Sequence, residues 1–416
     1  MKRLLMIAYH FPPLAGSSGI QRTLRFAEHL PEFGWSPIVL TTHPRAYERT
    51  HPDHLAALPP DLPVIRAQAW DAARHFSIAR RYPGCLALPD RWSSWRWGGI
   101  VSGLLALQKY RPAAIWSTFP IATAHMIGGT LARASRLPWV ADFRDPMAQD
   151  GFPVDPAQWR RYDQIERRTI ARASASVFAA PSALAEYRTR YPSHADHMHL
   201  IENGYDDTLT TPDTGSAPLN PGRLTVVHSG IVYPSERDPS QLFEALAQLK
   251  ASVPAQLDRL RLRFRGAVHE DLLHTLASRY GVEAFIEVCP LTDYRSATRE
   301  MLAADGLLLL QASNCNQQIP AKFYEYLASR RPILTLADPA GDTAQGARSA
   351  GLDALAPLDD AAAIATLLKH FIDAPAHGTR ATEASVQAAS RRARTAVLAT
   401  LLNGLVTDQP DSTPNP

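Results

Sequence analysis

The fold of this protein is decided by residues 4–26, which read LLMIAYHFPPLAGSSGIQRTLRF. The apolar run LLMIAYH at 4–10 has the length of one buried strand, and the Pro and Gly residues after it predict a turn. A helical pattern begins directly after the turn and extends over about 18–33. A strand that passes through a short turn into a helix is the repeating unit of parallel α/β sheets.

The same unit recurs in both halves of the chain, as short apolar strands alternating with helical patterns. In the first half, further strands are predicted at 37–42, 113–119, 138–143 and 176–180, and helices at 121–136, 156–173 and 182–190. In the second half, strands are predicted at 224–230, 260–266, 285–290, 306–311 and 332–337, and helices near 239–252, 268–280, 294–303, 321–329 and 359–373. We therefore predict an α/β fold made of two Rossmann-like, doubly wound domains.

The length of the chain agrees with two domains, because 416 residues exceed one typical hydrophobic core. Residues 206–222 are rich in Pro, Gly, Thr and Asp and have no apolar period, so they predict a linker. The two domains are then expected at 1–205 and 223–379. An Ala- and Arg-rich helix is expected at 380–405, returning toward the first domain, and a disordered tail at 406–416.

Positive charge and tryptophan gather in the first half. Residues 1–205 hold 24 Lys and Arg against 16 Asp and Glu, whereas residues 206–416 hold 19 against 24, and all 8 Trp lie within the first 159 residues. Cations beside interfacial aromatics suit an anionic membrane surface, and core Trp with solvated Arg is the alternative. The residues expected at that surface are Trp92, Trp95, Arg96 and Trp97. Nucleic acid is not expected, because no continuous basic stripe or binding motif occurs.

The cellular compartment is indicated by the cysteines and by the apolar runs. Cys85, Cys289 and Cys315 are few and odd in number, which disfavours a disulfide framework and fits a reducing cytoplasm. The longest apolar stretch, GGIVSGLLAL at 98–107, is about half as long as a membrane-spanning helix. We therefore expect a cytoplasmic protein that lies at most on the inner face of the cytoplasmic membrane.

A glycine-bearing loop, PPLAGSSGIQR at 12–22, connects the first strand to the first helix. The N–H groups at a helix start attract phosphate, and Gly16 allows the backbone to approach it closely. Because no G-x-G-x-x-G pattern occurs there, a nicotinamide or flavin dinucleotide is not predicted. A tight turn without a ligand is the alternative.

A second informative stretch is QQIPAKFYEYLASRRPIL at 317–334. Pro320 suits the first turn of a helix, where Lys322 would be unfavourable unless an anion is bound. Glu325 lies on the same face and can accept hydrogen bonds from a ribose diol. A surface Lys–Glu pair is the alternative.

These segments together resemble the family 4 glycosyltransferases. HFPPLAGSSGIQRTLRFAEHLPEFGWSPIVLTT at 10–42 resembles their first strand, loop and helix, LIENGYDD at 200–207 is similar to the segment before their linker, and PAKFYEYLASRRPIL at 320–334 resembles their donor-site helix. The resemblance covers essentially the whole chain in order. It implies a GT-B fold, in which two Rossmann-like domains face a cleft, the second holding a nucleotide-diphosphate sugar and the first an acceptor. It also implies a retaining transfer without a bound metal or other cofactor, and no D-x-D triplet occurs in the chain.

The resemblance assigns donor-binding residues one at a time. Gly16 matches the loop glycine at the diphosphate, and Glu325 matches the second acid of the family's paired-glutamate motif, on the ribose. Gln317 stands where the first acid would contact the sugar.

The basic residues of the donor site are also altered. Gly230 is followed by Ile231 instead of the usual Arg, while Arg237 lies near the usual Lys position. Arg237 and Lys322 are then the groups expected to neutralise the leaving diphosphate. For Arg237, an ion pair with Asp238 or Glu236 is the alternative.

The segment ADFRDPM at 141–147 follows a strand and resembles the Asp-x-Arg-Asp segment of polysaccharide-type members. Three residues in it are candidates for catalysis. Asp145 can orient or deprotonate the acceptor hydroxyl, Arg144 can contact phosphate, and Asp142 can support the loop. An internal salt bridge between Arg144 and one of these aspartates is the alternative.

The expected function is a retaining, hexosyltransferase-like glycosyltransferase. It would move a sugar from a nucleotide-diphosphate sugar to a lipid-linked or polysaccharide acceptor, as in bacterial exopolysaccharide or other surface-glycan biosynthesis. Gln317 and the missing Arg after Gly230 leave open a GT-B subunit that binds nucleotide sugar without catalysis. A nucleotide-sugar epimerase of the same fold is a further alternative.

Overall fold

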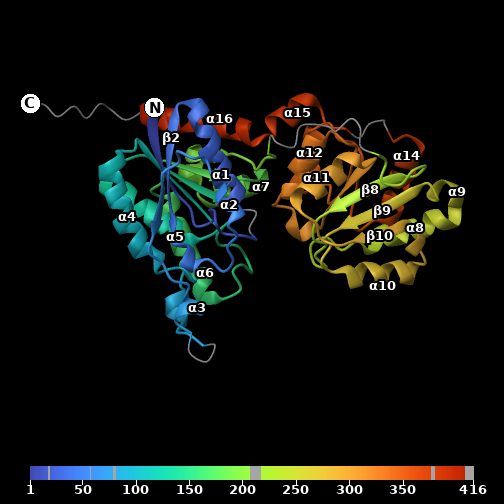
Figure 1. The fold of residues 1–416 in the computed structure, drawn as a ribbon, viewed down its shortest axis with the longest axis horizontal. Coiled ribbons are helices and arrows are strands. Elements are labelled where there is room, and N and C mark those ends of the chain that lie inside the picture. The colour runs from blue at the N-terminus through green and yellow to red at the C-terminus, as the bar shows by residue number, and fades with distance from the viewer. Residues whose placement is uncertain (17–18, 57, 78–80, 207–216, 376–379, 408–416) are drawn as a thin grey trace, which may run out of the picture. The chain divides into compact units, whose positions relative to one another are not determined.

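The computed structural model describes residues 1–16, 19–56, 58–77, 81–206, 217–375 and 380–407 (Figure 1). Two compact units make up the chain, one formed by Met1–Glu202 with Arg391–Pro416 and the other by Asn203–Ser390. Most of the predicted linker and most of the predicted tail lie outside the described residues.

The first unit is built on a parallel sheet with the strand order β3-β2-β1-β4-β5-β6-β7. Its strands are β1 Lys2–Ile7, β2 Trp35–Thr42, β3 Val64–Ala67, β4 Ala114–Thr118, β5 Trp139–Arg144, β6 Ala175–Phe178 and β7 Met198–Leu200. The five strands predicted from apolar runs are all present. β3 and β7 were not predicted, because they are short and most of their side chains are only partly buried.

Helices cover both faces of this sheet (Figure 1). They are α1 Gly19–His29, α2 Asp53–Ala56, α3 Ala72–His75, α4 Trp95–Tyr110, α5 Ala122–Ser135, α6 Pro156–Ile170, α7 Pro181–Arg190 and α16 Arg391–Thr407, with 3-10 turns at Leu30–Phe33, Pro44–Ala46, Gly84–Ala87 and Pro192–His197. The start of α6 illustrates the local signals: Asp155 caps the helix by accepting a hydrogen bond from the Gln158 N–H, and Pro occupies the first turn.

The end of the chain differs from the single closing helix predicted at 380–405. The structure has α15 Glu383–Ala388, then a break, then α16. At the break the Ala389 carbonyl accepts a hydrogen bond from the Tyr205 N–H, so the backbone bonds to a distant segment instead of continuing the helix. Beyond the break, Leu398 and Leu402 of α16 pack in the same apolar cluster as Leu24 of α1, which places the last helix in the first unit.

The second unit is built on another parallel sheet, with the strand order β10-β9-β8-β11-β12-β13. Its strands are β8 Leu224–Ser229, β9 Leu260–Arg265, β10 Ile286–Cys289, β11 Gly306–Gln311, β12 Ile333–Ala337 and β13 Leu355–Ala356. Its helices are α8 Ser240–Ser252, α9 Pro254–Leu257, α10 Glu270–Tyr280, α11 Tyr294–Ala303, α12 Ala321–Ser329, α13 Asp342–Ser349, α14 Ala361–Asp373 and α15, with 3-10 turns at Glu283–Phe285 and Ser313–Cys315.

Two apolar layers enclose the second sheet, one supplied by α8, α10 and α14 and the other by α11, α12, α13 and α15. Both units are therefore parallel sheets with helices on both faces, which confirms the predicted two-domain, Rossmann-like α/β fold. Among the helices of the described residues, none combines the length and apolarity that a membrane span requires.

Two fully buried histidines make stability depend on pH. Burial lowers the pKa of His125 in α5 and of His228 in β8 to about 4 each. Unfolded His has a pKa near 6.5. Between pH 6.5 and pH 4 these histidines are therefore protonated in the unfolded chain and neutral in the folded chain. The unfolding free energy is therefore expected to fall as pH drops through this window, by up to about 3 kcal/mol for each histidine.

Urea unfolding at several pH values measures this effect. His125→Gln should flatten the fall of unfolding free energy between pH 6.5 and pH 4, whereas His274→Gln, on the exposed face of α10, should leave it unchanged. Equal slopes for both variants and the parent protein would show that buried neutral histidine does not control acid stability.

Candidate functional site

A buried ion pair lies beneath the carboxyl edge of the first sheet. Arg22 of α1 donates from Nε to Asp142 Oδ2 at 2.9 Å and from Nη2 to Asp142 Oδ1 at 2.7 Å. The hydroxyl of Thr118, at the end of β4, donates to Asp142 Oδ2 at 2.8 Å. Both carboxylate oxygens of Asp142 accept hydrogen bonds, and the side chain is fully buried. This geometry favours a role for Asp142 in supporting the loop.

A cluster of His10, Gly19 and Arg144 lies where α1 begins. A Cβ placed on Gly19 would lie 2.5 Å from His10 Nδ1 and 2.8 Å from Arg144 Nη1, so the three residues are in close contact. Arg144 adopts a left-handed backbone conformation, with φ of 62°, and its Nε has no hydrogen-bond partner in the described part of the chain. The N-terminus of α1 and the Arg144 guanidinium together favour an anion at this position.

Burial shifts the protonation of this cluster. Burial and the nearby charge of Arg144 lower the pKa of His10 to about 4, so the imidazole is neutral at pH 7. Burial also lowers the pKa of Arg144 and raises that of Asp145, with the opposite charge of each acting against the shift of the other. In the described residues no salt bridge within 4.0 Å joins Arg144 to Asp142 or Asp145.

His10 and Gly19 are missing from the sequence-based candidates. Gly19 is visible in sequence as the second glycine of the loop, and His10 as a titratable residue just beyond the first strand. Their contact with Arg144 joins segments more than a hundred residues apart, which no local pattern reveals.

The loop after β5 is fixed by a buried carboxylate. Glu166 of α6 accepts hydrogen bonds from the hydroxyls of Tyr187 and Tyr191 and from the Ala148 N–H, and it pairs with Arg190 at 2.8 Å. The Tyr187 hydroxyl also accepts from the Met147 N–H at 2.8 Å. This network holds the backbone that follows Arg144 and Asp145.

In the second unit, candidate donor residues meet at the carboxyl end of β8. Gly230 has φ of 147° and open space where a Cβ would stand. Arg237 donates from Nη1 to the Ile231 carbonyl at 2.8 Å and lies over the Tyr233 ring, so its side chain folds back onto the Gly230–Ile231 turn. In the described residues Arg237 forms no ion pair with Asp238 or Glu236.

Helix α12 contributes the other two candidates to the same edge. Lys322 and Glu325 form an ion pair at 2.6 Å and are partly buried, as in the alternative of a Lys–Glu pair. Burial, with the nearby positive charges of Arg237 and Lys322 acting in the same direction, lowers the pKa of His228 to about 4. Both cations therefore lie close to the carboxyl end of β8.

The loop that carries Gln317 is hydrogen-bonded to the segment just before Arg237. The Ala312 N–H donates to the Glu236 carbonyl, and the Asn314 side chain donates to the Ser235 carbonyl, both at 2.8 Å. Gln317 itself is exposed in the turn before α12. Gly16 belongs to the first unit, where it has φ of 81°.

The expected membrane surface needs a correction. Trp95 is fully buried and packs near the ring of Tyr9, and Trp92 is half-buried and donates its indole N–H to the Ala46 carbonyl at 3.0 Å. Of the three tryptophans, Trp97 alone is exposed, with the Arg96 guanidinium over its ring. Trp95 points inward because it begins the buried face of α4, a helix that the sequence reading did not assign.

The chain is similar to known glycosyltransferases in sequence and in structure. Residues 18–204 match the family model described as glycosyl transferase 4-like domain, and no curated protein matches the sequence. The structure is similar to sucrose-phosphate synthase (tll1590) from Thermosynechococcus elongatus, with a TM-score of 0.67 and 16% identity, covering 98% of this chain and 100% of that chain.

Two further solved structures are similar to the chain. Alr3699/HepE from Anabaena, in complex with UDP and glucose, has a TM-score of 0.61 and 14% identity, with 97% of this chain and 100% of that chain covered. A UDP-N-acetylglucosamine 2-epimerase has a TM-score of 0.54 and 14% identity, with 99% and 100% covered. At these identities the likeness shows the fold alone. It confirms the predicted GT-B fold, and the family match confirms the resemblance to family 4 glycosyltransferases.

The buried ion pair beneath the first sheet predicts a large loss of stability on mutation. Asp142→Ala leaves the Arg22 guanidinium buried without its counter-charge, so the unfolding free energy should fall by about 3–5 kcal/mol. Asp163→Ala, which removes a solvent-facing partner of Arg167 in α6, serves as the control and should have little effect. Thermal or urea unfolding of the two variants checks this, and similar small losses in both would contradict the structural role of the Arg22–Asp142 pair.

Proposed function

This chain has a GT-B fold and matches the family 4 glycosyltransferases over residues 18–204. We propose that it transfers a sugar from a nucleotide-diphosphate sugar to an acceptor hydroxyl. The observation that carries the proposal is the meeting of Gly230, Arg237, Lys322 and Glu325 at one edge of the second sheet. Two cations, a carboxylate and an open glycine turn are the groups needed to hold a diphosphate and a ribose.

The diphosphate fits the cations. Lys322 lies in the first turn of α12, where the backbone N–H groups and the positive end of the helix dipole favour an anion. Lys322 pairs with Glu325, and a partly exposed pair of this kind is worth at most about 1 kcal/mol. Two phosphate groups next to Lys322 and Arg237 outweigh that pair, so Lys322 can turn to the diphosphate while Glu325 accepts hydrogen bonds from the ribose hydroxyls.

The same cations serve the chemical step. When the bond between the sugar and the diphosphate breaks, negative charge grows on the leaving phosphate oxygens, and Arg237 and Lys322 are positioned to stabilise it. A retaining transfer follows from the family resemblance, with the acceptor oxygen arriving on the face that the diphosphate leaves. We propose that Arg237 and Lys322 neutralise the charge of the leaving diphosphate, and we propose no cofactor or metal.

The acceptor is assigned to the first unit. Burial raises the pKa of Asp145, which makes its carboxylate a stronger base toward an acceptor hydroxyl. His10, Gly19 and Arg144 form the anion-favouring cluster beside it. An acceptor that carries a phosphate, as a lipid-linked sugar does, suits this combination, and we propose a cytoplasmic role in building such lipid-linked or polysaccharide glycans.

An epimerase is the second candidate, because one solved structure of similar fold is a UDP-N-acetylglucosamine 2-epimerase. An epimerase converts a nucleotide sugar without any acceptor, whereas a transferase releases a nucleoside diphosphate only as the sugar is moved. Product analysis with and without acceptor separates the two functions. Binding of the nucleotide sugar with neither product would favour a subunit that binds without catalysis.

Donor binding is tested first at Glu325. Glu325→Ala removes a charged hydrogen-bond acceptor worth about 1.5–3 kcal/mol, so calorimetry over a panel of nucleoside diphosphates should give roughly 10- to 150-fold weaker binding than the parent protein. Lys322→Ala should weaken binding comparably. Lys369→Ala disrupts an exposed Lys–Asp pair on α14 of the same unit and is the matched control. Parental affinity in the Glu325 and Lys322 variants would reject this donor site.

The cluster in the first unit is tested at Gly19. Gly19→Ala puts a methyl group closer to His10 and Arg144 than van der Waals contact allows, so these side chains must shift, and kcat/KM for sugar transfer should fall at least tenfold while the protein stays folded. Gly404→Ala in α16, where nothing lies within 4 Å of the new Cβ, is the control. Equal kcat/KM for the two variants would remove the cluster from the reaction.

A further inference from the structure

Helix α4 carries large apolar residues on its solvent face, where a surface helix ordinarily has polar ones. Its buried positions are Trp95, Gly99, Gly103 and Ala106, while its outer face carries Trp97, Val101, Leu104 and Leu105, exposed by 69%, 61%, 41% and 61%. The four large residues recur at helical spacing on one face. We call them the α4 outer face.

The buried face of α4 explains why the large residues are not needed for the fold. A Cβ on Gly99 would lie 2.5 Å from Ile127 Cδ1, and one on Gly103 would lie 2.3 Å from Leu131 Cδ1, both in α5. The two helices are therefore so close that only glycine fits between them. The α4 outer face adds no packing to this contact and remains in solvent.

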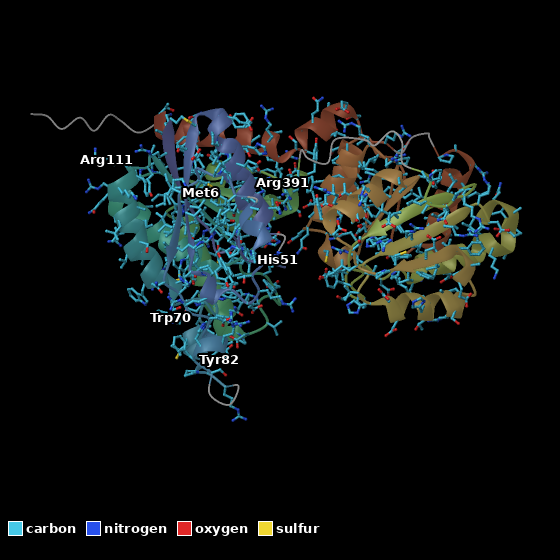
Figure 2. The ribbon with its side chains drawn as sticks, viewed as in Figure 1. Met6, His51, Trp70, Tyr82, Arg111 and Arg391 are labelled. Atoms are coloured by element: carbon cyan, nitrogen blue, oxygen red, sulfur yellow. The ribbon has the colours of Figure 1, made fainter. Side chains whose placement is uncertain are left out.

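The apolar surface continues beyond the start of α4. A cavity of about 410 Å³ is lined by Trp70, Phe76, Leu86, Leu88 and Trp97, with Arg96 at its edge. Trp70, Phe76 and Leu86 are themselves among the exposed large apolar residues of the first unit. Figure 2 shows Arg111 just past the end of α4 and Trp70 toward its other end. The α4 outer face and the cavity together extend between these two residues.

The segment that contains α4 carries charges of one sign. Residues 91–111 contain no Asp or Glu. Arg96 stands at the first turn of α4, and Lys109 and Arg111 stand at its end. Two of these cations lie over aromatic rings, Arg96 at 5.2 Å from the Trp97 centroid and Lys109 at 4.9 Å from that of Tyr110. Apolar side chains between Trp–Arg and Tyr–Lys pairs match the chemistry of a membrane interface.

The dimensions of α4 argue against other occupants. A helix of 16 residues is about 24 Å long and about 10 Å wide, which gives an outer face of roughly 240 Å². Stable protein interfaces bury about 800 Å² on each partner, so a second copy of the chain would need much more contact than this face offers. A bilayer needs no complementary shape and accepts a single helix face.

We propose that the α4 outer face and the cavity at the start of α4 lie on the surface of an anionic lipid bilayer, with the helix parallel to the membrane plane and Arg96, Lys109 and Arg111 at the lipid phosphates. This binding does not depend on sugar transfer. It replaces Trp92 and Trp95 of the sequence-based expectation with side chains that are exposed.

Vesicle flotation tests the proposal on the full chain. The protein should float with vesicles of 70% phosphatidylcholine and 30% phosphatidylglycerol and not with phosphatidylcholine alone, and raising NaCl from about 50 mM to about 500 mM should reduce the bound fraction, because surface charges are screened. The double variant Val101→Asp/Leu105→Asp should bind at least tenfold more weakly. Val397→Asp, at an exposed apolar position of α16, is the matched control and should bind as the parent does.

Two measurements keep the result interpretable. Hydrogen exchange on the parent protein should slow in residues 95–110 when the anionic vesicles are added, which needs no variant to fold. Light scattering on the free protein should give a molecular mass unchanged by Val101→Asp/Leu105→Asp. No flotation with anionic vesicles, parental binding by the double variant, or a dimer that this variant dissociates would each overturn the membrane assignment.

Discussion

The first unit depends on the bidentate ion pair between Arg22 and Asp142. Two charges removed from water are unfavourable unless every donor and acceptor is satisfied, and here Arg22 also donates to the carbonyls of Ile201 and Glu202. One guanidinium thus joins α1, the end of β5 and the point where the chain leaves the first unit. The Glu202 carboxylate in turn pairs with Arg394 of α16 at 2.6 Å, so the last helix is held at the same place. Gly19 lies in α1 with Arg22, and Arg144 lies in β5 with Asp142, so the ion pair joins two of the segments that form the cluster of His10, Gly19 and Arg144.

In the second unit the candidate site depends on cations that lie close to the buried His228. That histidine stays neutral because burial and both cations lower its pKa. The Tyr326 hydroxyl accepts a hydrogen bond from the Ser229 N–H at 2.9 Å, which anchors α12 to the end of β8 and keeps Lys322 and Glu325 beside the Gly230 turn. The ion pair between those two side chains satisfies both charges, and the proposed donor would replace it with phosphate and ribose groups.

The sequence was sufficient for the strands that are fully buried, because an unbroken apolar run bounded by turn residues has few other interpretations. It was insufficient for β3, β7 and β13, which are short and mostly only partly buried. It was also insufficient for α4, whose solvent face carries large apolar residues and so does not resemble a surface helix. Lys322 and Glu325 could be paired from their spacing of three residues. The contact of His10 with Arg144 could not, since only the folded sheet brings their loops together. Trp95 and Trp97 differ by two positions, yet one is buried and the other exposed, a distinction that requires knowing how α4 is oriented.

The central claim is that the carboxyl edge of the second sheet holds a nucleoside diphosphate. The most direct measurement is a crystal structure of the protein with the nucleoside diphosphate that binds most tightly in calorimetry. We expect phosphate oxygens within hydrogen-bonding distance of Arg237 and Lys322, ribose hydroxyls on Glu325, and an opened Lys322–Glu325 pair. A nucleotide bound elsewhere with that pair still closed would contradict it.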